Sequence, residues 1–129
     1  MDKRGGQGCA EHRAIMVVED DSDIRECVQL LLEEEGYLVV TAANGAEAET
    51  LLANLGEAGS PCLMLLDLMM PVMSGWELLE HLRRDGKLSD GLRVVVLSAA
   101  PSNVPLGPVA CMRKPVPLDK LLAAVRQYC

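Results

Sequence analysis

Aromatic side chains are nearly missing from this chain of 129 residues, which has no Phe, two Tyr and one Trp. A core must therefore be built from Leu, Val, Ala and Met, and a hydrophobic content of 50% is enough for such a core in one globular domain. This length leaves no room for a second catalytic or DNA-binding domain, so we expect a single domain.

The chain also lacks an excess of basic residues. Its 12 Lys and Arg are outnumbered by 19 Asp and Glu, which gives a net charge of -7 and an isoelectric point near 4.7. Nucleic acid and anionic membrane surfaces both attract basic patches, so we expect neither as a direct partner. A cation or a basic protein surface suits this charge better.

Long apolar runs are missing as well. No stretch approaches the roughly 18 uninterrupted apolar residues that cross a membrane, so we expect no membrane insertion. Residues 1–12 are polar and Gly-rich and lack the apolar middle of a signal peptide. We expect a disordered lead-in there, followed by one domain over residues 13–129.

The five cysteines show no CxxC spacing, and most of them lie within apolar segments. They are Cys9, Cys27, Cys62, Cys111 and Cys129. Small buried hydrophobic side chains explain this pattern better than a zinc site or a disulfide framework, which predicts a reducing, cytoplasmic location.

Short apolar runs alternate with segments of helical periodicity, as is typical of βα units around a parallel sheet. The predicted strands are 14–18, 38–41, 62–66, 93–97 and 109–112, and the predicted helices begin near Ser22, after Gly45, near Gly75 and at Leu118. Residues 99–108 stand where one more helix would be expected. Three prolines and a glycine leave room for one turn at most, so we expect that helix to be truncated or replaced by a loop.

Polar residues stand where the predicted strands end. Glu19 and Asp20 follow the first strand, Asp67 the third, Ser98 the fourth and Lys114 the fifth. Because the carboxyl ends of parallel strands meet at one edge of a sheet, where such folds bind ligands, we expect these side chains to converge.

This combination of groups suits phosphoryl transfer to a carboxylate. Three clustered carboxylates repel one another unless a cation neutralises them, and oxygen ligands of this kind suit Mg²⁺. Asp67 could then act as the nucleophile, while the Lys114 ammonium offsets phosphoryl charge and the Ser98 hydroxyl donates to a phosphoryl oxygen.

Four motifs carry a family resemblance. They are VVEDD at 17–21, LLDLMMPVMSG at 65–75, VLSA at 96–99 and RKP at 113–115. In this order and spacing the chain resembles the receiver domain of two-component response regulators. The resemblance implies a (βα)₅ flavodoxin-like fold with strand order 2-1-3-4-5, and a phosphoryl group accepted from a sensor histidine kinase or a histidine phosphotransfer protein.

The resemblance also implies a role for each matching residue. Asp67 matches the phosphoacceptor, Asp20 a direct Mg²⁺ ligand, Glu19 a ligand acting through water, the Met69 backbone carbonyl a further ligand, Ser98 the switch hydroxyl and Lys114 the active-site lysine. Such a domain catalyses its own phosphorylation and dephosphorylation without being an enzyme in the ordinary sense. Its output would pass through binding to a downstream protein that the sequence does not identify.

The sequence departs from the family pattern around its output surface and its hydrolytic water path. Cys111 stands at the switch position where receivers commonly carry an aromatic residue, and the segment 99–108 is shortened. Met69 and Ala100 match the family positions that border the path of the hydrolytic water, and neither side chain can hold a water by hydrogen bonding. We therefore expect an altered relay of the signal and a long-lived phosphoryl group.

Three other classes of protein compete with this interpretation. A degenerate receiver would never turn over phosphate, but the complete set of acidic residues, hydroxyl and lysine argues against it. An aspartyl phosphohydrolase usually needs a carboxylate two residues after its nucleophile, where this chain has Met69. A flavodoxin would need a phosphate-binding loop after the first strand, where Glu19, Asp20 and Asp21 would repel phosphate.

Overall fold

The computed structural model describes residues 14–55, 61–68, 70, 72–85, 92–98, 110–114 and 116–128. The predicted lead-in at 1–12 and the segment 99–108, where a loop is predicted in place of a helix, lie outside these residues. Among the helices that the structure describes, none has the length and apolar character needed to cross a membrane.

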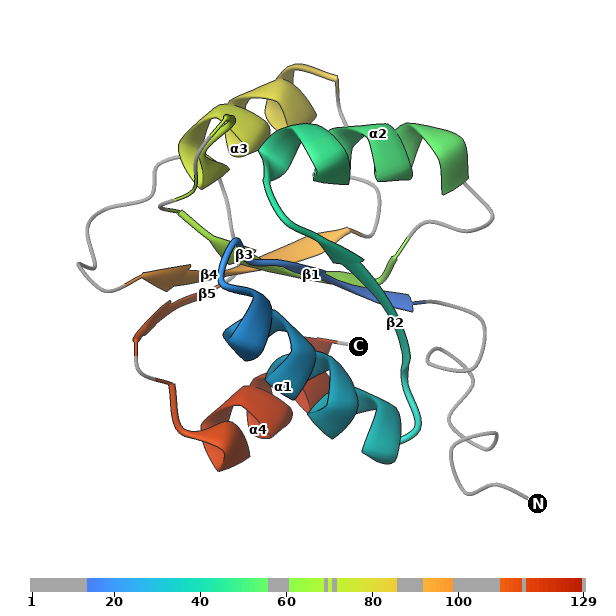
Figure 1. Ribbon diagram of the computed structural model, residues 1–129, viewed down its shortest axis with the longest axis vertical. Coiled ribbons are helices and arrows are strands. Elements are labelled where there is room, and N and C mark those ends of the chain that lie inside the picture. Colours follow the sequence, from blue (N-terminus) through green and yellow to red (C-terminus); the bar gives the residue numbers. More distant parts are fainter. Residues whose placement is uncertain are drawn as a thin grey trace.

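A five-stranded parallel sheet forms the middle layer (Figure 1). Its strands are β1 (Ala14–Val18), β2 (Leu38–Ala42), β3 (Leu63–Asp67), β4 (Arg93–Ser98) and β5 (Ala110–Arg113). They lie in the order β2-β1-β3-β4-β5, all neighbours running parallel, which confirms the predicted flavodoxin-like strand order. The bounds differ from the prediction by a residue at several ends, and β3 includes Asp67 itself as its last residue.

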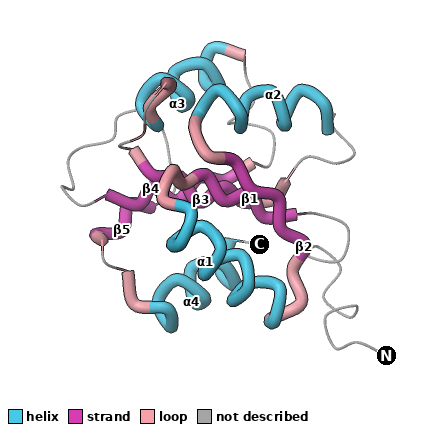
Figure 2. Tube along the Cα trace, viewed as in Figure 1, coloured by secondary structure: helices cyan, strands magenta, loops and turns pink. Residues whose placement is uncertain are grey.

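Helices cover both faces of this sheet. They are α1 (Ser22–Glu34), α2 (Gly45–Leu55), α3 (Gly75–Arg84) and α4 (Leu118–Tyr128). Helices α2 and α3 lie on one face and α1 and α4 on the other, so that the described elements form three layers (Figure 2).

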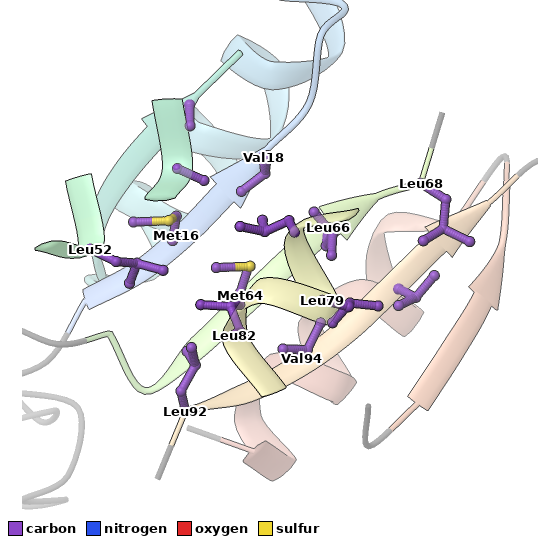
Figure 3. Close-up of a cluster of buried hydrophobic side chains, with 14 residues drawn as sticks. Met16, Val18, Leu52, Met64, Leu66, Leu68, Leu79, Leu82, Leu92 and Val94 are labelled. Atoms are coloured by element: carbon purple, nitrogen blue, oxygen red, sulfur yellow. The ribbon is translucent and has the colours of Figure 1, made fainter. Parts of the chain in front are cut away.

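Each face of the sheet has its own apolar core. Below α2 and α3, fourteen buried side chains including Met16, Met64 and Leu79 pack together (Figure 3). On the other face, Leu32 from α1 and Leu121 from α4 pack onto alternate strand residues such as Leu65. Strand β3 is buried along its whole length, as expected for a central parallel strand covered on both sides. Its last residue, Asp67, is therefore buried with the rest of the strand.

Side-chain caps fix where α1 and α3 begin. The Asp21 carboxylate accepts hydrogen bonds from the backbone N–H groups of Asp23 and Ile24, as is typical of Asp at this position. Ser74 and Glu77 form a capping box at the start of α3, which the sequence analysis did not identify. Both caps lie directly after strand-end loops, so they fix the loops at the carboxyl edge of the sheet.

One prediction about the cysteines is wrong. Cys62 is buried just before β3 and is disulfide-bonded. Cys27 is free and exposed, so it is not one of the buried apolar cysteines either. Spacing along one sequence does not reveal which cysteines the fold brings together, so this pairing could not be foreseen.

Candidate functional site

Three carboxylates meet at the carboxyl edge of the sheet. Glu19, Asp20 and Asp67 each offer an oxygen atom, and these oxygens all lie within 4.8 Å of one another. Strands β1 and β3 are neighbours with Val18 opposite Leu66, so the residues that follow these two positions are adjacent in space. The fold thus brings together the acidic residues that the sequence marks at two strand ends.

Two of these carboxylates are buried and one is exposed. Glu19 is 3% and Asp67 4% accessible to solvent, whereas Asp20 is exposed. Buried carboxylates are costly unless a positive charge or hydrogen bonds compensate them. A cation beside Glu19 and Asp67 would offset the cost of burying them, and Asp20 leaves one acidic group facing water.

Lys114 supplies a positive charge to both buried carboxylates. Its Nζ donates a hydrogen bond to Glu19 Oε1 at 2.8 Å and lies 3.4 Å from Asp67 Oδ2. The residue follows β5, and its backbone N–H donates to the Ser98 carbonyl at 2.8 Å. This backbone bond holds the lysine at the end of β4, so that its side chain reaches across to β1 and β3.

The pKa values reflect this arrangement. Burial raises the pKa of Glu19; the hydrogen bond from Lys114 opposes the shift, and the charge of Asp67 adds to it. Burial alone would lower the pKa of Lys114, but the hydrogen bond and charge of Glu19 and the charge of Asp67 outweigh it and hold that pKa above the ordinary lysine value. The ammonium is therefore firmly retained, while the acidic group beside it tends to take up a proton or a cation.

Backbone contacts hold Glu19 in place. Its N–H donates to the Ala42 carbonyl at 3.0 Å, and its own carbonyl accepts from Arg25 Nη1 at 2.8 Å. Its side chain also accepts from the Asp21 N–H at 3.3 Å. No motif marks Arg25 in the sequence, where its one signal is a basic residue in the first turns of the helix that follows the acidic pair.

The structure describes the remaining predicted site residues to different extents. Ser98 is the last residue of β4 and is buried, one position beyond the residue paired with Asp67. Cys111 lies in β5 with its backbone opposite Val96, but its side chain is outside the described set. Met69, the predicted carbonyl ligand, is also outside it.

The donor set fits Mg²⁺. It consists of oxygen atoms only, from three carboxylates, and the exposed Asp20 leaves one side open to water. Mg²⁺ characteristically binds one or two carboxylates and keeps several waters, with room for a phosphoryl oxygen. Glu19, Asp20 and Asp67 are the residues that would hold it.

Comparison with known proteins identifies the class. The family of response regulator receiver domains matches residues 15–126, and the chain belongs to this family. It is 36% identical over 118 residues to the response regulator MprA of Mycobacterium sp. (strain KMS), an alignment that covers 87% of this chain and 48% of MprA. An uncharacterized 14.6 kDa protein of Leptolyngbya boryana is 35% identical over 121 residues, with 89% and 88% covered. The chain thus spans about half the length of regulators such as MprA.

Solved structures agree with this assignment. The response regulator TrrA of Thermotoga maritima, determined with Mg²⁺ and BeF, has a TM-score of 0.77 at 29% identity, covering 91% of this chain and 99% of TrrA. A CheY-like receiver domain protein of Methanospirillum hungatei JF-1 also has a TM-score of 0.77 at 29% identity, with 89% and 91% covered. The predicted family and fold are therefore confirmed.

The charges of the site lead to a prediction about stability. Asp67→Asn should stabilise the metal-free protein by about 1 kcal/mol, a few degrees in Tm, because Asp67 faces two carboxylates and shares one ammonium with Glu19. Mg²⁺ should raise the Tm of the wild type and have a smaller effect on the variant. Thermal unfolding followed by circular dichroism measures both. Glu26→Gln, which removes one exposed charge from α1, is the matched control, and equal melting curves for wild type and Asp67→Asn without metal would contradict the prediction.

Proposed function

We propose that this chain accepts a phosphoryl group on Asp67 from a sensor histidine kinase or a histidine phosphotransfer protein, in a reaction that needs Mg²⁺. The observation that carries this proposal is the cluster of three carboxylates within 4.8 Å with the Lys114 ammonium 3.4 Å from Asp67. Membership of the receiver family and the likeness to TrrA, determined with Mg²⁺ and BeF, support it.

Each residue then has a defined part in the transfer. An Asp67 carboxylate oxygen attacks the phosphorus, the bond to the donor nitrogen breaks, and an acyl phosphate forms on Asp67. The Lys114 ammonium already lies beside the attacking carboxylate and offsets the added negative charge. Ser98, at the end of the adjacent strand, would donate its hydroxyl to a phosphoryl oxygen. A bound Mg²⁺ would supply further positive charge at the transferring group.

Glu19 has a second part in this scheme. Before transfer it is the nearer partner of Lys114, at 2.8 Å against 3.4 Å for Asp67. If Glu19 and Asp20 held a divalent cation, that cation would offset the Glu19 charge, and the ammonium would be available to Asp67 and its phosphoryl group. The buried Glu19 would then link metal binding to the position of the lysine.

We further propose that output passes through binding to another protein, because the net charge of -7 does not suit direct contact with nucleic acid. The cytoplasm is the proposed location, since a relay of this kind draws on phosphoryl groups derived from ATP. The alternative of a degenerate receiver is disfavoured because the carboxylates, the hydroxyl and the lysine are all present.

The test of the proposed function is phosphorylation by acetyl phosphate. Wild-type protein with Mg²⁺ should gain one hydroxylamine-sensitive phosphoryl group by intact mass spectrometry, and chelation of Mg²⁺ or Asp67→Asn should abolish it. Asp119→Asn, the same change at an exposed position of α4, should be labelled like the wild type. Labelling of Asp67→Asn at the wild-type level would exclude Asp67 as the acceptor.

A further inference from the structure

The turn between β2 and α2 contacts the loop that follows Asp67. Gly45 is the first residue of α2, and its backbone N–H donates a hydrogen bond to the Met73 carbonyl at 3.0 Å. Met73 belongs to the connection between β3 and α3, and α2 and α3 lie over the same face of the sheet (Figure 1). Gly45, which is not part of the carboxylate cluster, therefore contacts the loop that leads from Asp67 to α3.

The far end of this loop returns to the end of β3. The Gly75 N–H donates to the Leu68 carbonyl at 3.0 Å. A Cβ atom on Gly75 would lie 2.7 Å from the Asp67 carbonyl oxygen and 2.8 Å from Leu68 Cα. The backbone that begins α3 is therefore in direct contact with Asp67, and a displacement of Met73, two residues earlier, would be passed on to it.

No side chain fits at Gly45 without such a displacement. A Cβ atom there would lie 2.8 Å from the Met73 carbonyl oxygen and 2.9 Å from Met73 Cγ. Side-chain motion could relieve the second contact, but the first is with backbone, so the loop itself must move. The glycine allows a close approach that holds two loops together.

The same loop contains a strained residue. Val72 has φ of 69°, a left-handed conformation that β-branched residues rarely adopt, and the residue is 81% exposed. Such strain persists only where the surrounding structure fixes the backbone. The hydrogen bond from Gly45 to Met73, the next residue, is one of the contacts that fix it.

We propose that Gly45 is a positioning residue for phosphoryl transfer: its contact with Met73 holds the loop between β3 and α3, and through Gly75 this loop holds Asp67 in the geometry that accepts a phosphoryl group. This inference rests on the proposed function of Asp67. The contacts that tie Gly45 to the loop are made with Met73, so its effect on Asp67 is transmitted along the backbone from Met73 to Gly75.

The test is Gly45→Ala in the full chain, with acetyl phosphate as donor and phosphorylation followed by intact mass. The maximal rate should fall about ten- to hundredfold, as for a small misplacement of a reacting group, while the acetyl phosphate concentration at half-maximal rate changes little. The Kd of Mg²⁺, measured by isothermal titration calorimetry, should rise several-fold because Asp67 is also a metal ligand.

Ala53→Gly is the matched control, because it weakens the same helix at an exposed position without touching the loop. It should lower the Tm and leave both the rate and the Kd of Mg²⁺ unchanged. If Gly45→Ala alone does not fold, the comparison is made in the Val72→Gly background, where loss of the side chain from a left-handed position adds stability.

The outcomes separate this inference from the function on which it rests. A wild-type protein that takes no phosphoryl group would overturn both. A labelled wild type together with a wild-type rate and Mg²⁺ affinity in Gly45→Ala would overturn the role of Gly45 alone. Equal slowing by Ala53→Gly and Gly45→Ala would also overturn it, because general loss of stability would then explain the rate.

Discussion

Replacing Lys114 with Met should destabilise the metal-free protein by about 1–3 kcal/mol, since it leaves two buried carboxylates without their cation. The lysine side chain is 22% exposed, so some of its interaction with Glu19 is screened by water, and the expected loss is below that of a fully buried pair. Chemical denaturation with chelator present measures the change in the free energy of unfolding.

The sign of the pH dependence follows from the raised pKa of Lys114. The folded state binds this proton more tightly than the unfolded chain does, so the ion pair contributes its full stability below the pKa of the unfolded lysine. That contribution is lost as pH rises through the higher pKa of the folded state. The free energy of unfolding of Lys114→Met should therefore differ most from that of the wild type at neutral pH, and the difference should shrink at strongly alkaline pH.

Mg²⁺ should restore much of the stability that Lys114→Met loses. A divalent cation bound by Glu19, Asp20 and Asp67 replaces the missing positive charge, so Mg²⁺ should stabilise Lys114→Met more than it stabilises the wild type. Lys120→Met, at an exposed position of α4, is the control and should change stability little. If Lys120→Met lost as much stability as Lys114→Met, the contacts of Lys114 with the carboxylates would not be the cause of the destabilisation.

The sequence predicts much of this fold because strand ends are easy to recognise in it. The run that ends at Asp67 is apolar without alternation, which indicates a strand covered on both faces, and β3 is such a strand. The acidic residues after 14–18 and the lysine after β5 could then be placed at one edge from topology alone. The structure brings Glu19, Asp20, Asp67 and Lys114 together there.

Contacts made through the backbone could not be predicted in this way. Arg25 binds a carbonyl group and Gly45 donates from its N–H, and neither bond depends on a side-chain pattern that one sequence reveals. The disulfide of Cys62 likewise depends on which segments meet in space.

Helical periodicity alone also predicts too long a buried face for α1. The spacing of Ile24, Val28 and Leu32 places all three on one face of α1, but Ile24 is 43% exposed because it lies in the first turn, next to the exposed cap. Val28 and Leu32, one and two turns further along, are buried. Periodicity predicts the face of the helix on which a side chain lies. Whether that side chain is buried also depends on how far the sheet extends beneath that turn of the helix.

The lifetime of the phosphoryl group is expected to be long compared with that in receivers whose side chains hold a water in line with the acyl phosphate. The family positions that border this water are Met69 and Ala100 in this chain, and neither side chain offers a donor or acceptor of useful strength. Both residues lie outside the described part of the structure, so this expectation rests on the sequence and on family membership.

Changing Met69 to Asn and Ala100 to Glu should therefore accelerate loss of the phosphoryl group. If each new side chain contributes one hydrogen bond of about 1 kcal/mol to the hydrolytic transition state, the double variant should dephosphorylate about thirtyfold faster. The measurement is the decay of the phosphorylated mass after removal of acetyl phosphate, with Mg²⁺ present throughout. Ala53→Glu, which adds the same acid to an exposed position of α2, should keep the wild-type lifetime. An unchanged lifetime in the double variant would mean that hydrolysis is limited by something other than the positioning of water, such as access to the acyl phosphate beside Lys114.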